Sequence, residues 1–268
     1  MDYIKLTESA FDIFYKKYPS YERLPYEIVF AKDMYEICLE LTKGENAKDD
    51  LKAEKQSISN SQANLVLAGK PGEVSYIVIK DNENVKRAEF ACLAVHELVH
   101  LHDSYDFAMA FGDSDFHKAF VHEQKLGEHA WSEFHANTIS FEVFYNFLID
   151  NNNDYTFDYI LKAEIERLPA LADGLKRHIS TNNNPSLYYI LLYLGQFNTL
   201  ERLSNGAVSF KKDCPLFLFI KFGELIMSLY SLLCRMNDFG SAKDNFAELI
   251  ELVDLMESTY CQRKSELK

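Results

Sequence analysis

Histidine is concentrated in one short part of this chain. Seven of the eight histidines lie between positions 96 and 135, and two of them belong to the sequence His96-Glu97-Leu98-Val99-His100. In an α-helix, residues four apart differ by about 40° around the axis, so both imidazoles could bind one metal ion. Glu97, beside the first histidine, could take a proton from a metal-bound water. The pattern predicts a Zn²⁺ site with hydrolytic chemistry.

The third ligand of this site must come from elsewhere in the chain, because a catalytic zinc ion usually takes three protein ligands and leaves one position for water. Glu133 is the best candidate, since Asn137 lies one helical turn further on and could orient a ligand. His129, one turn before Glu133, is an alternative. Asp103 is another, because it falls on the metal-facing side of the motif helix.

The sequence gives less specific predictions for His102 and for the residue that would stabilise an oxyanion. His102 points to another side of the motif helix, so we expect an ordinary structural or exposed histidine there. A hydrolase of this kind also needs a group that stabilises the developing oxyanion. The sequence does not distinguish among four candidates, which are Tyr105, His117, His122 and His129.

Two short β-rich runs and two helices are predicted around the motif. Residues 64–68 and 74–80 flank Gly69-Lys70-Pro71-Gly72, a strong turn signal, and should form a small antiparallel ribbon. A helix should run from residue 85 to about residue 102 and carry the motif. Residues 102–128 look irregular, with a short helix over 116–123, and a further helix over 128–149 should carry Glu133.

The outer parts of the chain are predicted to be helical. Apolar residues at three-to-four spacing suggest two or three helices over residues 7–55. The polar cluster at 150–154 suggests a boundary between a domain over 1–150 and a helical domain over 151–268. The expected fold is α+β and predominantly helical, with a zincin-like catalytic lobe, a small sheet and an all-helical carboxy-terminal lobe. The helices of that lobe are expected over 157–178, 186–203, 215–236 and 241–261.

The motif region resembles the ImmA/IrrE family of zinc metallopeptidases. The resemblance rests on the run from Val74 to Lys80, on Ala94-Val95-His96-Glu97-Leu98-Val99-His100 and on Glu133-x-x-Ala136-Asn137, and it covers residues 74–145 only. It implies that His96, His100 and Glu133 bind zinc and that Glu97 is the catalytic base. It also implies a regulatory protein as substrate. Family members usually have glycine where this chain has Val99, and the interval from His100 to Glu133 is long.

Composition and charge narrow the possible partners. The chain has 28 Lys and Arg against 41 Asp and Glu, a net charge of −13, which disfavours direct nucleic-acid binding and favours a basic protein. Five scattered cysteines without a C-x-x-C pair indicate neither a disulfide framework nor a cysteine zinc site. The acidic amino terminus argues against a signal peptide. Charges within residues 215–236 indicate a buried helix and no membrane span, so we expect a cytoplasmic protein.

These observations together predict a zinc-dependent intracellular peptidase that cleaves a protein substrate. The alternative is a non-catalytic interaction or regulatory protein that keeps the metal site as a structural or vestigial feature. A structural site would be closed by four protein ligands, whereas a catalytic site keeps a position open.

Overall fold

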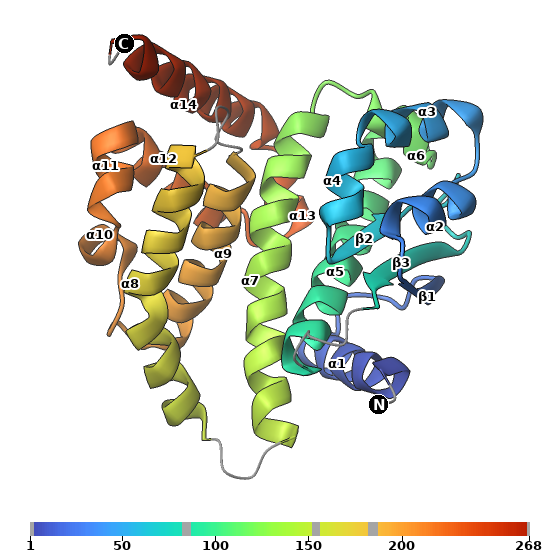
Figure 1. Ribbon diagram of the computed structural model, residues 1–268, viewed down its shortest axis with the longest axis horizontal. Coiled ribbons are helices and arrows are strands. Elements are labelled where there is room, and N and C mark those ends of the chain that lie inside the picture. The colour runs from blue at the N-terminus through green and yellow to red at the C-terminus, as the bar shows by residue number, and fades with distance from the viewer. Residues whose placement is uncertain (1–2, 82–86, 152–155, 182–186, 267–268) are drawn as a thin grey trace. The chain divides into compact units, whose positions relative to one another are not determined.

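The computed structural model describes residues 3–81, 87–151, 156–181 and 187–266 (Figure 1). The chain forms two compact units. The α+β unit comprises Met1–His122 and Ile139–Asn153, and the helical unit comprises Glu123–Thr138 and Asp154–Lys268. One continuous helix, α7 (Lys125–Asn151), contributes its first half to the helical unit and its second half to the α+β unit. The prediction of a predominantly helical α+β fold is confirmed, and the boundary at residue 150 stays a prediction.

The sheet of the α+β unit has three strands in the order β1-β3-β2. They are β1 (Tyr26–Ala31), β2 (Ala63–Val66) and β3 (Ser75–Lys80). The β2 and β3 strands are antiparallel, with Val66 opposite Tyr76, so the predicted ribbon is confirmed. The turn between them contains Gly72, whose φ of +91° is a conformation that favours glycine.

The strand β1 was not predicted, because residues 7–55 read as helices only. It pairs in parallel with β3, and Tyr26 lies opposite Ser75. Parallel strands require a long connection, so this pairing depends on residues that are distant in sequence. The helical periodicity around β1 belongs to its neighbours, and the isolated run of β-branched and aromatic residues becomes a strand through its contact with β3.

Six helices in the described residues of the α+β unit accompany the second half of α7. They are α1 (Tyr3–Lys17), α2 (Met34–Leu41), α3 (Glu45–Ala53), α4 (Lys55–Asn60), α5 (Arg87–Phe111) and α6 (Phe116–Phe120). The helix α5 contacts β2, β3 and α1. It extends beyond the predicted end near residue 102, because Phe107 and Ala108 are buried and continue its apolar packing. Its predicted start at residue 85 lies outside the described residues.

The core of this unit lies on both faces of β3. Val78 belongs to a buried cluster with Met34 and Cys38 of α2. Ile77 and Ile79 point to the opposite face, because successive side chains of a strand alternate, and both are fully buried. The sheet is therefore covered on both sides, which gives α5 a rigid support.

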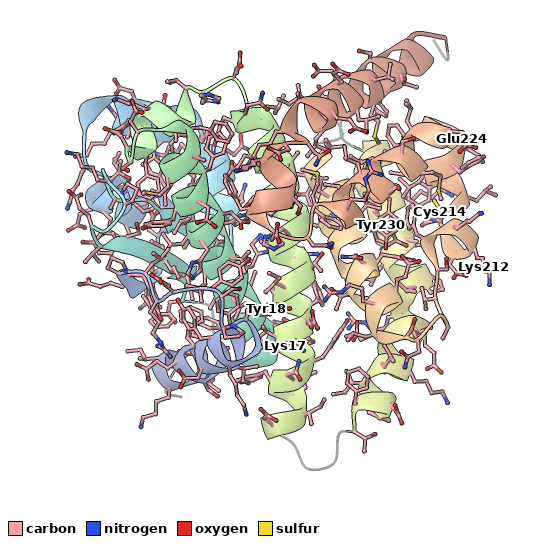
Figure 2. All side chains as sticks on the ribbon, turned by 180° about the vertical axis from the view of Figure 1, so that it is seen from behind. Lys17, Tyr18, Lys212, Cys214, Glu224 and Tyr230 are labelled. Atoms are coloured by element: carbon pink, nitrogen blue, oxygen red, sulfur yellow. The ribbon has the colours of Figure 1, made fainter. Side chains whose placement is uncertain are left out.

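A buried acidic residue ties the second half of α7 to α1. Glu142 accepts a hydrogen bond of 2.7 Å from the hydroxyl of Tyr18, and its other carboxylate oxygen lies 3.1 Å from the Nζ atom of Lys17. Lys17 is the last residue of α1 and Tyr18 follows it (Figure 2). A buried carboxylate requires such partners, so this cluster holds α7 in a defined position within the α+β unit.

The helical unit contains only helices within the described residues. Besides the first half of α7 they are α8 (Phe157–Thr181), α9 (Leu187–Leu203), α10 (Phe210–Asp213), α11 (Leu216–Phe222), α12 (Glu224–Arg235), α13 (Phe239–Lys243) and α14 (Phe246–Glu266). The expected helices over 157–178 and 186–203 are confirmed as α8 and α9, with the expected start at residue 186 lying outside the described residues. Residues 193–200 of α9 are all buried, so α9 is the central helix of this unit.

The single helix predicted over residues 215–236 is wrong. Gly223, with a φ of +59°, separates α11 from α12, and the two helices are bent by 106°. Similarly, a break after Lys243 separates α13 from α14 where one helix was expected over 241–261. In the described part of the chain no single helix is long and apolar enough to cross a membrane; α11 and α12 meet that criterion only as a bent pair.

Candidate metal centre

The two histidines of the motif lie on one face of α5, as their spacing predicts. The Nε2 atoms of His96 and His100 are 2.9 Å apart, and the two rings are nearly perpendicular, with centroids 4.5 Å apart. His96 is buried and His100 is half-buried. The two nitrogen atoms therefore converge on one small region beside the helix.

Glu133 of α7 completes a group of three potential ligands. One ligand atom from each of His96, His100 and Glu133 lies within 4.8 Å of the other two. Glu133 is buried, with 6% of its surface exposed. Among the residues that the structure describes, this is the only group of three or more His, Cys, Asp or Glu side chains with such convergence. These three residues could hold a metal ion.

The donor set and its dimensions fit a transition-metal ion. Zinc binds imidazole nitrogen at about 2.0–2.1 Å, so two such ligands at a tetrahedral angle are about 3.3 Å apart. The observed 2.9 Å between the Nε2 atoms is close to that separation and requires only a small opening of the pair. Two imidazoles with one carboxylate are also the ligands of a known class of catalytic zinc sites, and imidazole suits copper, iron and nickel as well.

The two alternative third ligands do not join this group. His129 lies one turn before Glu133 on α7, but it is exposed, whereas Glu133 is buried. Asp103 is buried on α5, yet its carboxylate is not among the converging ligand atoms. The structure thus brings Glu133, and neither alternative, to the two histidines of the motif.

Glu97, which lies between the two histidines in sequence, is also buried. Burial raises the pKa of the Cys38 thiol, the side-chain amide of Asn64 lowers it, and the negative charge of Glu97 raises it further. The Nδ2 atom of Asn64 lies 3.5 Å from the Cys38 sulfur. The carboxylate of Glu97 is therefore within electrostatic reach of α2, in a region largely closed to water.

His102 has a structural role, as its position on the helix predicts. Its Nε2 atom lies 3.2 Å from the hydroxyl oxygen of Tyr15, and its ring packs against Phe14, Tyr15 and Tyr21. The candidates for oxyanion stabilisation are dispersed. His117 is exposed, and the ring of His122 packs at a tilt against Phe111. None of the four candidate residues belongs to the metal-binding group.

The side-chain amide of Asn137 contacts α9. Its Nδ2 atom donates a hydrogen bond to the carbonyl oxygen of Leu192 in α9. This bond joins two helices, and Asn137 therefore helps to fix α7 against α9. Gly195 and Thr199 of α9, which were not predicted from the sequence, contact α7 at Phe134 and at Thr138. The sequence signal for them was two small residues four apart in one helix.

Comparisons with known proteins leave the resemblance to the ImmA/IrrE family as a prediction. No family model matches the chain, no curated protein matches it, and no solved structure matches it. The residues of the site, and the contacts that support them, are therefore the basis for the function proposed below.

Proposed function

We propose that this protein is a zinc-dependent peptidase that acts on a protein substrate inside the cell. The observation that carries the proposal is the convergence of His96, His100 and Glu133 to within 4.8 Å, with Glu97 on the same helix as the two histidines. The resemblance of this region to ImmA/IrrE peptidases supports the same reading. A bound zinc ion would polarise the scissile carbonyl and lower the pKa of its water ligand to about 7.

Different residues of the chain would bind the metal and transfer the proton. His96 and His100 would each supply an imidazole nitrogen and Glu133 a carboxylate oxygen to the metal, and a catalytic zinc ion with three protein ligands keeps a fourth position for water or substrate. Glu97 is the general base: its carboxylate accepts the proton of the attacking water and then delivers it to the leaving amine. Because Glu97 is buried, few bulk water molecules compete for its carboxylate.

The acidic character of the chain suggests the chemistry of the substrate. A net charge of −13 attracts a basic protein at long range and repels nucleic acid. The rate of association with a basic substrate should fall as salt rises, because a Debye length of about 8 Å at physiological ionic strength screens exposed charges. Tight binding of plain duplex DNA by the purified protein would contradict this assignment.

The experiment that tests the proposal measures zinc and cleavage in the same preparations. The purified parent and the variants His96→Ala and Glu133→Gln are loaded with zinc and analysed for metal content. Each is then incubated with a peptide library derived from a whole proteome, and new amino termini are identified by mass spectrometry. We expect zinc and cleavage in the parent and the loss of most of both in the two variants.

His129→Ala is the matched control, because it removes an exposed histidine one turn from Glu133 on the same helix. It should keep the zinc content and the cleavage pattern of the parent. Retention of full zinc by Glu133→Gln would remove Glu133 from the ligand set. A zinc-loaded parent that cleaves no peptide would favour the non-catalytic alternative.

A further inference from the structure

The helix α9 approaches α7 closely immediately after Glu133. A Cβ atom added to Gly195 would lie 2.6 Å from the carbonyl oxygen of Phe134 and 2.9 Å from the Cβ atom of Asn137. Real Cβ atoms do not approach other atoms so closely, so this crossing requires glycine. The backbones of the two helices are thus in direct contact at the turn that follows the third ligand.

Buried hydrogen bonds fix the same turn of α7 along its axis. The hydroxyl of Thr199 donates to the carbonyl oxygen of Thr138 at 2.8 Å, and Thr199 is fully buried. The hydroxyl of Thr138 lies 3.2 Å from the carbonyl oxygen of Gly195. Asn137 donates to the carbonyl oxygen of Leu192. These buried groups bind each other and no longer bind water. A slide or rotation of α7 would therefore leave buried polar atoms without hydrogen-bond partners.

Two more contacts hold the first half of α7 within the helical unit. An added Cβ atom at Gly127 would lie 2.7 Å from the carbonyl oxygen of Phe246. The indole nitrogen of Trp131 donates to the carbonyl oxygen of Met236 at 2.7 Å. The helical unit therefore fixes α7 on both sides of Glu133, at residues 127–131 and at residues 134–138.

We infer that the helical unit, through Gly195 and Thr199 of α9, positions Glu133 for metal binding. The inference rests on the proposed metal site and assigns a role to the helical unit. A metal site needs its ligand atoms held to within about 0.5 Å of their binding positions. A glutamate side chain is flexible, so its carboxylate can be placed that accurately only if the backbone of its helix is held in position. Gly195 and Thr199 are positioning residues that touch neither metal nor substrate; they act through the backbone of α7.

Two pairs of variants test this role. Gly195→Ala places a methyl group against the backbone of α7, and its control is Gly174→Ala in α8, where an added Cβ atom meets nothing within 4 Å. Thr199→Val removes the hydrogen bond to α7 at nearly constant volume, and Thr199→Ser is the conservative variant that keeps the hydroxyl. The readouts are the zinc Kd from chelator competition, the visible spectrum of the Co²⁺-loaded protein and the Tm without metal.

We expect Gly195→Ala and Thr199→Val to raise the zinc Kd about 10- to 100-fold, the range typical of groups that orient metal ligands. Their Co²⁺ spectra should shift toward that of Glu133→Gln. Gly174→Ala and Thr199→Ser should stay within about twofold of the parent in Kd on the same scale. The spectrum matters because a purely structural role would lower the Tm without changing the ligand field.

The inference is overturned if Gly195→Ala lowers the Tm but keeps the parent zinc Kd and Co²⁺ spectrum. If Gly195→Ala does not fold, equal zinc Kd values for Thr199→Val and Thr199→Ser overturn it instead. A parent that binds no zinc would overturn both this inference and the proposed function. A parent that binds zinc without cleaving peptides would remove only the proposed function, because none of these readouts depends on catalysis.

Discussion

Replacing Glu97 by glutamine separates proton transfer from metal binding. Glutamine has nearly the size and shape of glutamate, so it should fit the buried position, of which 9% is exposed, while removing the basic carboxylate. Glu97 is not one of the three converging ligands. Zinc content and Tm should therefore remain close to those of the parent.

The expected loss is in the rate of peptide cleavage. A positioned acid–base group typically contributes about 10²- to 10⁴-fold to the rate, which corresponds to about 2.7–5.4 kcal/mol of activation free energy. The structure also provides an internal reporter of the substitution. Because the charge of Glu97 raises the pKa of the Cys38 thiol, Glu97→Gln should lower that pKa, although burial will keep it above the value of an exposed thiol.

The assay compares zinc-loaded parent, Glu97→Gln and the control Glu89→Gln on a peptide that the parent cleaves. Glu89 is exposed in the first turn of α5, so its substitution tests the loss of a charge on the same helix without touching the site. Cleavage by Glu97→Gln at the parent rate would show that Glu97 is not the general base. Loss of zinc together with activity would show instead that Glu97 maintains the metal site.

Three further predictions concern the surroundings of the site. Trp131→Phe removes the buried hydrogen bond to Met236 and some ring volume, so the free energy of unfolding, measured by urea denaturation followed by circular dichroism, should fall by about 2–4 kcal/mol. Tyr18→Phe removes the hydroxyl that binds Glu142 and should cost about 1–2 kcal/mol in the same assay; an unchanged midpoint would show that Lys17 alone suffices. Burial raises the pKa of Cys234 from 9.0 to about 11, so at pH 8 its thiol should be alkylated about 100-fold more slowly than an unshifted thiol, as followed by mass spectrometry. Equal alkylation rates in the folded and urea-unfolded chain would refute that shift.

The sequence alone predicted the local parts of this protein. A four-residue spacing on one helix fixes the relation of His96 to His100, because helix geometry is the same in every context. The glycine-rich turn likewise predicted the β2–β3 ribbon, and long amphipathic runs predicted α8 and α9. The three potential ligands could also be predicted from the sequence, since Glu133 was proposed as the third ligand because Asn137 lies one helical turn further on.

Tertiary structure decided what depends on distant contacts. The strand β1 forms because it pairs in parallel with β3. The helix α5 continues to Phe111 because Phe107 is buried in the core. The choice of Glu133 over His129 is a matter of burial, which a sequence pattern on one helix does not fix. The hydrogen bond from Asn137 to a backbone carbonyl of α9 and the close contact at Gly195 both depend on the packing of two helices about 60 residues apart. Local geometry is encoded by neighbours in sequence, whereas the position of Glu133 is set by packing, and packing is a property of the folded chain.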